Sequence, residues 1–253
     1  MSNGDFMNSN NNIEVTEVIR IMDAGATQPV LCRCNDGNLY VIKSTASASR
    51  KELVHEFVAA SLAKYICLSI PDFAIIYIPN EIVDYLPPQL KGRLSQGYAF
   101  ASYYIRDSAN ISFDMAHQAI DLQSQKKIYL FDRVINNSDR TLSDMGGNVN
   151  IIYNVKEQRY YLIDHNLAFD PNCQDADFNY HVYSPRHRSW EYDMVDATSN
   201  EDLLNSVNSV CPGIVAGLPD EWLGDDQTKQ HVIDNILSIL ARGRNDSFRR
   251  AII

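Results

Sequence analysis

The sequence lacks the features of a membrane or secreted protein. It contains no apolar stretch that approaches the roughly 20 residues a membrane-spanning helix needs. Its N-terminus does not show the basic-then-apolar order of a secretory signal peptide. We therefore expect no membrane association and a cytoplasmic location.

Cysteine is sparse and irregularly spaced. The five cysteines are an odd number and show none of the spacings of a disulfide framework. Cys32 and Cys34 form a C-x-C pair, but no second Cys or His pair stands at zinc-ligand spacing. We predict that this pair is buried and reduced, as is usual in the cytoplasm.

Basic residues are outnumbered by acidic ones. The chain has 22 Lys and Arg against 32 Asp and Glu, a formal net charge of −10. This balance argues against direct, non-specific nucleic-acid binding, which depends on clustered Lys and Arg that neutralise phosphates. A local cationic pocket for a phosphorylated ligand remains compatible with it.

The 253 residues, 45% of them apolar, predict an α+β protein of two joined lobes. Residues 1–12 form a polar tail with little to bury. Residues 13–105 show period-two runs with an Asp36-Gly37 hairpin signal and one helix, which predicts an antiparallel, β-rich lobe. Residues 106–253 are mostly helical, with a polar loop and a small hairpin between the helices. The expected strands are Ile13–Ile21, Val30–Cys34, Leu39–Lys43, Phe73–Ile78, Tyr98–Ile105, Asn150–Tyr153 and Tyr160–Ile163, and the expected helices are Arg50–Ile66, one that starts near Asp121, Leu203–Val210 and Gln227–Ala241.

A lysine in the β-rich lobe stands out. Lys43 ends an apolar strand and shares a face with Leu39 and Val41, so it needs an acidic partner or a phosphate if it is buried. Glu56 in the following helix can supply the carboxylate, as in the Lys–Glu pairs of phosphoryl-transfer enzymes. Glu52, four residues earlier on the same helical face, is the competing partner.

A small-residue break precedes this lysine. Gly25-Ala26-Thr27-Gln28-Pro29 is neither a Walker A sequence nor a G-x-G-x-x-G sequence. Its backbone N–H groups can cradle a phosphate, and a plain turn is the alternative reading.

A more specific set of residues lies in the helical lobe. Asp139 follows a buried helix in a polar loop, Asn148 and Asn150 lead into a short strand, and Asp164 ends the next one. Two carboxylates and a carboxamide form a hard-oxygen set that suits Mg²⁺ with nucleotide phosphates. In such a set the first Asp orients or deprotonates an attacking hydroxyl, and the other two residues hold the metal.

These residues carry a resemblance to a known family. The runs Phe131–Thr141, Gly147–Ile152 and Tyr160–His165 resemble the core of short HipA-like kinases, with the pattern F-D-x-x-x-x-N-x-D-R-T, N-P-N-L-L and L-W-L-I-D-H-G. They are more distantly similar to phosphatidylinositol kinases. Looser matches extend the resemblance over residues 13–250, and they are Gly25–Pro29, Val41–Lys43, Glu56–Ala59, Ser69–Pro71, Ala99–Ser102 and Leu218–Leu223.

The resemblance implies a two-lobed protein-kinase-like fold and an ATP- and Mg²⁺-dependent serine/threonine protein kinase. It implies a catalytic role for Asp139, Lys43 and Glu56, and metal ligation by Asn148 and Asp164. The nucleotide contacts that it implies come from Gly25, Ala26, Thr27, Lys43, Ser102, Tyr103 and Tyr104.

Two departures from the family pattern keep alternatives open. The family has an Asn five residues after the catalytic Asp, where this chain has Asp144, so Asn148 implies a four-residue insertion and Asp144 is the alternative ligand. The acidic hinge residue expected near Ser102 is replaced by Tyr103 or Tyr104. The other functions are therefore a nucleotide-binding pseudokinase that acts through a partner protein, or a kinase for a lipid or a small molecule. The protein substrate is not identifiable from the sequence.

Overall fold

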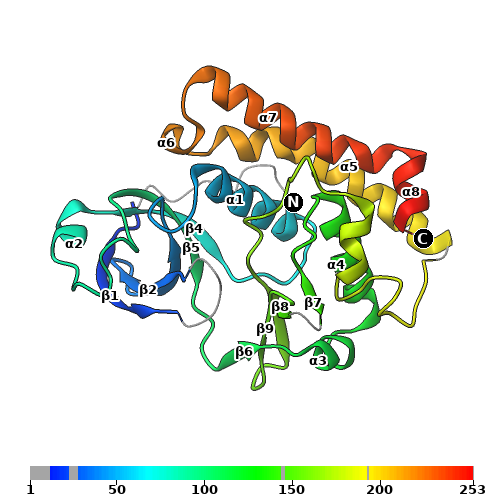
Figure 1. The fold of residues 1–253 in the computed structure, drawn as a ribbon, viewed down its shortest axis with the longest axis horizontal. Coiled ribbons are helices and arrows are strands. Elements are labelled where there is room, and N and C mark those ends of the chain that lie inside the picture. Colours follow the sequence, from blue (N-terminus) through cyan, green and yellow to red (C-terminus); the bar gives the residue numbers. More distant parts are fainter. Residues whose placement is uncertain (1–11, 23–27, 144–145, 193, 253) are drawn as a thin grey trace. The chain divides into compact units, whose positions relative to one another are not determined.

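The structure, a computed structural model, describes residues 12–22, 28–143, 146–192 and 194–252. They form an α+β fold with an antiparallel sheet in the N-terminal part and helices in the C-terminal part, as the sequence predicts (Figure 1). The chain divides into two compact units that are discontinuous in sequence. The first comprises the chain up to Val54, Asp72–Tyr104 and Ala216–Gly224, and the second comprises His55–Pro71, Ile105–Val215 and the chain from Asp225.

The first unit is built on a five-stranded sheet of order β1-β2-β3-β5-β4, in which all pairs are antiparallel. Glu14, just before β1, forms a parallel bridge with Tyr77 of β4, and the Tyr77 N–H donates to the Ile13 carbonyl at 2.9 Å. Because this bridge joins the two edge strands, the sheet curls around one core. The strands are β1 (Val15–Ile21), β2 (Val30–Cys34), β3 (Leu39–Lys43), β4 (Phe73–Ile78) and β5 (Gly97–Tyr103).

The predicted hairpin between β2 and β3 is confirmed. Gly37 has a φ of +82°, which only glycine adopts without strain. The Asn38 N–H donates to Asp36 Oδ1 at 3.0 Å, so the aspartate side chain closes the turn.

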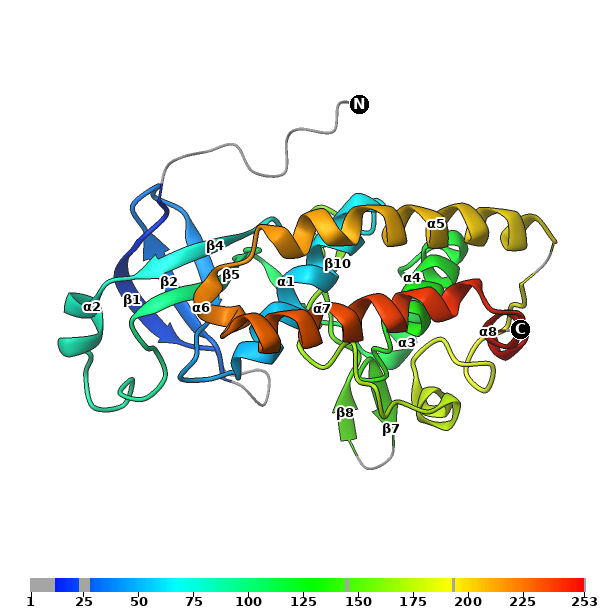
Figure 2. The same cartoon turned by 90° about the horizontal axis from the view of Figure 1, so that it is seen from above.

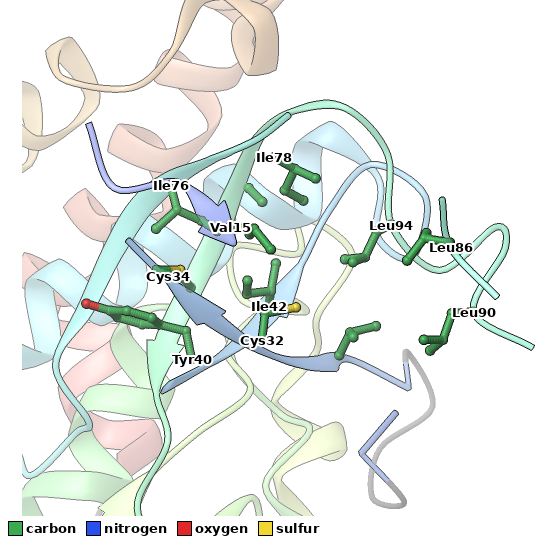
Figure 3. Packing of buried hydrophobic residues seen from close by; sticks show 13 residues of the cluster. Val15, Cys32, Cys34, Tyr40, Ile42, Ile76, Ile78, Leu86, Leu90 and Leu94 are labelled. Atoms are coloured by element: carbon green, nitrogen blue, oxygen red, sulfur yellow. The ribbon is translucent and has the colours of Figure 1, made fainter. Parts of the chain in front are cut away.

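The core of this unit fills the inside of the curled sheet (Figure 3). Cys32 and Cys34 are buried within it, with free thiols, in agreement with the prediction from their C-x-C spacing. Burial raises the pKa of both thiols, that of Cys34 to about 12, so neither is a reactive thiolate at neutral pH. The other members include Val15, Tyr40, Ile42, Ile76, Ile78, Leu86, Leu90 and Leu94.

Helix α1 (Arg50–Tyr65) begins with a reciprocal cap. The Ser49 N–H donates to Glu52 Oε2 at 2.7 Å, and the Glu52 N–H donates to Ser49 Oγ at 3.2 Å. This contact assigns the Glu52 carboxylate to the helix start, whereas Glu56, one turn later, is only 3% exposed. The short helix α2 (Asn80–Asp84) lies at the start of the 81–96 region, which the sequence analysis leaves without regular structure.

A C-terminal segment completes the first unit. In Ala216–Gly224, which contains helix α6 (Asp220–Leu223), two side chains bind the backbone of Tyr98 in β5. The Tyr98 N–H donates to Glu221 Oε1 at 3.3 Å, and the Trp222 indole N–H donates to the Tyr98 carbonyl at 3.0 Å. Strand β3 ends at Lys43, opposite Phe100, so these side chains bond to the backbone of β5 beyond the end of β3.

This contact requires glycine at residue 97. Gly97 has a φ of +116°, and a Cβ atom there would lie 2.4 Å from Glu221 Oε1. We therefore expect Gly97→Ala to lower the free energy of unfolding by about 1–3 kcal/mol, the usual cost of a strained backbone position. Gly213→Ala is the matched control, because a Cβ atom at this helical position meets nothing within 4 Å. In urea unfolding of the two variants, Gly213→Ala should instead raise the free energy of unfolding by about 0.5–1 kcal/mol. Equal changes in the two variants would refute the requirement for glycine at residue 97.

The second unit contains two small sheets. Strands β6 (Ser108–Asn110), β9 (Ile151–Asn154) and β10 (Arg159–Leu162) pair in the order β10-β9-β6. Strands β7 (Thr141–Ser143) and β8 (Gly146–Asn148) form a hairpin, labelled in Figure 2. The sequence analysis predicts β9 and β10 but neither β6 nor this hairpin.

Most of the second unit is helical: α3 and α4 lie between β6 and β7 in the sequence, and α5, α7 and α8 follow β10. Helices α5 and α7 run side by side (Figures 1 and 2), and Asn208 Nδ2 donates to the Leu240 carbonyl at 3.4 Å. Within the described ranges, no helix is both long and apolar enough to cross a membrane. The elements are α3 (Phe113–Gln118), α4 (Leu122–Val134), α5 (Met194–Ala216), α7 (Asp226–Ala241) and α8 (Asp246–Ile252), with the 3₁₀ helices η1 (Asp175–Tyr180) and η2 (Arg242–Arg244).

Candidate active site

Two of the predicted nucleotide-binding positions lie within the sheet of the first unit. Lys43 is the last residue of β3, is 7% exposed and pairs with Phe100 of β5. Ser102 lies in β5 between Val41 and Phe73, its partners on the two neighbouring strands. Glu56 belongs to the second unit, so its pairing with Lys43 stays a prediction.

The end of β5 carries the two tyrosines of the predicted hinge. The Tyr103 N–H donates to the Asp72 carbonyl at 2.7 Å, and the Tyr104 N–H donates to the Leu39 carbonyl at 2.9 Å. The Tyr103 ring packs edge-on against Tyr40, with ring centroids 5.1 Å apart. Since both peptide N–H groups are engaged inside the first unit, they are not the donors that a purine base would use here.

Four predicted site residues lie outside the described residues. They are Gly25, Ala26 and Thr27 of the predicted phosphate loop, and Asp144, the alternative metal ligand. Their roles stay predictions.

The loop that carries Asp139 is anchored on a fully buried ion pair. Arg140 Nε lies 2.7 Å from Asp132 Oδ2, and neither side chain is exposed to solvent. Asn137 Nδ2 donates to Asp132 Oδ1 at 2.8 Å, and His181 Nε2 lies 3.0 Å from Asp132 Oδ2. The Tyr183 N–H donates to His181 Nδ1, so the His181 proton is on Nε2 and is donated to Asp132.

The electrostatics of Asp132 follow from these partners. Burial favours the neutral acid, but the Arg140 charge and the hydrogen bond from His181 outweigh it, so the pKa of Asp132 lies far below its usual range. Burial is the main reason that the pKa of His181 is lowered, and the attraction of Asp132 offsets it only in part. The loop is therefore held by a carboxylate that stays ionised, between a guanidinium and a neutral imidazole.

Asp139 itself is bound by Asn150. Asn150 Nδ2 donates to Asp139 Oδ2 at 2.9 Å and approaches the Asp139 carbonyl at 3.3 Å. Asn150 is 2% exposed, and its own carbonyl accepts from Arg140 Nη1 at 2.5 Å and from the Ile163 N–H at 3.0 Å. One residue thus fixes one carboxylate oxygen of Asp139 and ties its loop to both strands of the β9–β10 hairpin.

Asn148 has a different environment. It pairs with Thr141 at the base of the β7–β8 hairpin, and its Oδ1 accepts from the Asn150 N–H at 3.0 Å. Within the long spacing from Asp139 to Asn148, the described residues pair as β7 and β8, and β8 leads the chain back to Asn150. The structure brings Asn148, Asn150 and Asp139 together.

Asp164 lies at the same end of the β9–β10 hairpin as Asn150, because the Ile163 N–H bonds to the Asn150 carbonyl. Asp164 has a φ of +60° and Asn150 a φ of +50°, in the left-handed region that Asp and Asn tolerate better than other side chains. Directly after Asp164, the His165 N–H donates to Glu56 Oε1 at 3.0 Å. Positive φ angles at residues with polar contacts are common at functional sites.

Two residues of this site are absent from the sequence-based site residues. Asn150 is named there only beside Asn148, with which it forms an N-x-N motif before a short strand, and Arg140 is present only as part of the D-R-T motif. The signals in the sequence were the position of Asn150 directly before an apolar strand and the place of Arg140 beside a candidate catalytic carboxylate.

The donor set fits a hard divalent cation. Asp164 supplies a carboxylate and Asn148 a carboxamide oxygen, which has a second lone pair beside its bond to Asn150. Within the described residues, no group of three or more His, Cys, Asp or Glu side chains could hold a metal. Carboxylate and carboxamide oxygens are the ligands that Mg²⁺ takes, together with water and phosphate oxygens.

Comparison with known proteins identifies the family. The chain matches the HipA-like kinase family over residues 15–252. It is similar to the crystal structure of the proinflammatory kinase CtkA of Helicobacter pylori, with a TM-score of 0.55 and 13% identity over 95% of this chain and 96% of that one. It also resembles the Golgi casein kinase solved with Mn and ADP, with a TM-score of 0.47 and 13% identity over 93% of this chain and 74% of that one.

No curated protein sequence matches the chain at a significant level. The likeness to CtkA shows a kinase fold, and the match to the family spans nearly the whole sequence. The motifs around Asp139, Asn148 and Asp164 stand within that match. The chain belongs to the HipA-like kinase family.

Proposed function

We propose that this kinase transfers the γ-phosphate of ATP, with Mg²⁺, to a Ser or Thr hydroxyl of a protein. The observation that carries the proposal is the contact between Asn150 and Asp139, at the end of the β9–β10 hairpin where Asp164 also lies. This arrangement supports a carboxylate fixed for proton transfer beside oxygen ligands for a metal.

The reaction assigns a role to each group. Asp139 accepts the proton of the attacking hydroxyl, whose oxygen forms a bond to the γ-phosphorus while the bond to the β–γ bridging oxygen breaks. Asn150 holds Asp139 Oδ2 and so orients the carboxylate that accepts this proton. Lys43, oriented by Glu56, binds the phosphates.

Asn148 and Asp164 would hold Mg²⁺, which when bound neutralises charge on the phosphate oxygens. The backbone of Gly25, Ala26 and Thr27 would contact the same phosphates. Ser102, Tyr103 and Tyr104 would line the base, through side chains and carbonyl oxygens rather than through the N–H groups of the two tyrosines.

The packing around Asp139 bears on the pseudokinase alternative. The long spacing between Asp139 and Asn148 is the reason for that alternative, but strands β7 and β8 pair within this spacing, and Asp139 is bonded to Asn150. This supports catalysis. A lipid or small-molecule acceptor is distinguished from a protein only by experiment.

The test is to incubate the purified protein with γ-labelled ATP and Mg²⁺, with and without a cell extract as acceptor, and to map phosphorylated residues. We expect label on Ser or Thr of extract proteins. Label in the lipid or small-molecule fraction would change the acceptor class. Nucleotide binding without transfer or hydrolysis would refute the proposal in favour of a pseudokinase.

Substitution of Asn148 and of Asn150 should affect different kinetic parameters. We expect Asn148→Ala to raise the Mg²⁺ concentration needed for half-maximal activity by about tenfold or more, because it removes a metal ligand. Asn150→Ala should lower kcat by about 10–100-fold at an unchanged KM for ATP, because it releases Asp139. Asp144→Ala is the control and should retain activity. Loss confined to Asp144→Ala would show that the five-residue spacing decides the metal ligand.

A further inference from the structure

His165 stands at the junction of the groups proposed to bind nucleotide and metal. It follows Asp164 directly and is 1% exposed. Its backbone N–H donates to Glu56 Oε1 at 3.0 Å, and its ring packs edge-on against Phe131, with centroids 6.3 Å apart. A polar ring that is fully buried beside a candidate metal ligand needs partners for both nitrogens.

The partner of Nε2 determines where the ring proton is. Arg140 Nη2 lies 3.3 Å from His165 Nε2. A guanidinium has only donors, so Nε2 must accept, and the proton of the neutral ring is on Nδ1. Arg140 is itself held in place by Asp132, with which it forms the buried ion pair.

The Nδ1–H group faces the carboxylate that the backbone already binds. Nδ1 lies 3.7 Å from Glu56 Oε1, beyond a normal hydrogen bond but close enough for attraction between the N–H dipole and the carboxylate in a low-dielectric interior. His165 thus approaches the same oxygen of Glu56 with two N–H groups, that of its backbone and that of its ring. The Glu56 side chain is 4% exposed, and that of His165 is 2% exposed, so little water competes.

We propose that His165 is a positioning residue that, as the Nδ1–H tautomer set by Arg140, couples Glu56 to the loop of Asp164. The chain Asp132–Arg140–His165–Glu56 then fixes two separate elements of the site, helix α1 and the end of β10, through one imidazole. The role in metal and nucleotide binding rests on the proposed function, whereas the tautomer rests on the geometry alone.

The first test uses two amide isosteres. His165→Asn places a donor where Nδ1 is and loses the acceptor for Arg140. His165→Gln offers Arg140 a carbonyl oxygen and has no donor at the Nδ1 position. Binding of ADP with Mg²⁺ is measured by calorimetry, and folding is monitored by the thermal midpoint.

We expect His165→Gln to weaken binding by about 10–100-fold, the usual effect of removing a group that orients a metal ligand. His165→Asn should stay within about threefold of the unsubstituted protein, because the contact with Glu56 is the one that matters for ligand binding. Equal losses in the two variants, or a larger loss in His165→Asn, would overturn the proposal and leave His165 as a residue that packs against Arg140.

The second test needs no nucleotide or metal. The ¹⁵N chemical shifts of the His165 ring in the ligand-free protein should show a protonated Nδ1 and an unprotonated Nε2. The opposite tautomer would overturn the proposal. If the unsubstituted protein binds no ADP, the proposed function fails, and this spectrum still decides the coupling between Arg140, His165 and Glu56.

Discussion

Replacement of Asp139 by alanine should lower phosphoryl transfer by about 10²–10⁴-fold, the range for removal of a positioned acid–base group. The physical reason is that Asn150 fixes Asp139 Oδ2, so the carboxylate is held in one orientation for the transfer of the hydroxyl proton. The variant should fold normally, because Asp139 is not a member of the buried ion pair below it. Transfer of labelled phosphate under single-turnover conditions measures the effect.

The control for this variant is a carboxylate of the same unit that has no role in the proposed mechanism. Asp107 forms an exposed pair with Lys156, at 2.6 Å, and Asp107→Ala makes the same change in net charge. It should leave both transfer and stability close to those of the unsubstituted protein. Full activity in Asp139→Ala would remove the proposed base, and equal losses in both variants would point to a charge effect.

Replacement of Asp132 by alanine should be the most destabilising change in the second unit. It leaves the Arg140 guanidinium buried without its counter-ion and also removes the acceptor of His181. Breaking such a pair from one side costs about 3–5 kcal/mol of unfolding free energy. Urea unfolding at pH 7 measures this loss. Asp107→Ala is the matched control, because both side chains of the Lys156–Asp107 pair are exposed, and it should leave the free energy of unfolding close to that of the unsubstituted protein.

The same variant should change the acid dependence of stability. Because the pKa of Asp132 is lowered in the folded protein, its contribution is complete above the unfolded value of about 3.9 and is lost as the pH falls from there towards the folded value. The difference in unfolding free energy between the unsubstituted protein and Asp132→Ala should therefore be constant from pH 5 to pH 7 and shrink below about pH 4. A difference that is constant down to pH 2 would show that folding does not lower the pKa of Asp132.

The sequence predicts the fold where local signals are strong. The Asp36-Gly37 turn and the apolar spacing of α1 are local, and the structure has both elements close to the expected bounds. Helix α5 is different, because the expected helix ends at Val210, before Pro212, whereas the observed helix continues to Ala216. Cys211 and Val215 are buried on either side of the proline, so packing offsets the lost backbone hydrogen bond.

The sequence locates candidate site residues but does not give their contacts. The D-R motif, the N-x-N motif and the aspartate after an apolar strand locate Asp139, Asn148 and Asp164, which the structure places around one hairpin end. The choice of Asn150 as the partner of Asp139 depends on the β7–β8 hairpin, a pairing of chain segments that no single-residue preference encodes. The same holds for His165, because its tautomer follows from its contact with Arg140, a residue 25 positions away in the sequence.

The segment Ala216–Gly224 has a consequence for the order in which the chain can fold during synthesis. The side chains of Glu221 and Trp222 bind Tyr98 of β5, so the first unit is incomplete until residue 224 is made. About 120 residues separate Tyr104 from that point, and at 5–20 residues per second they take roughly 6–24 s to translate. For that interval the nascent β-sheet exposes the backbone of Tyr98, so the first unit closes only after residues 105–215 of the second unit have been made.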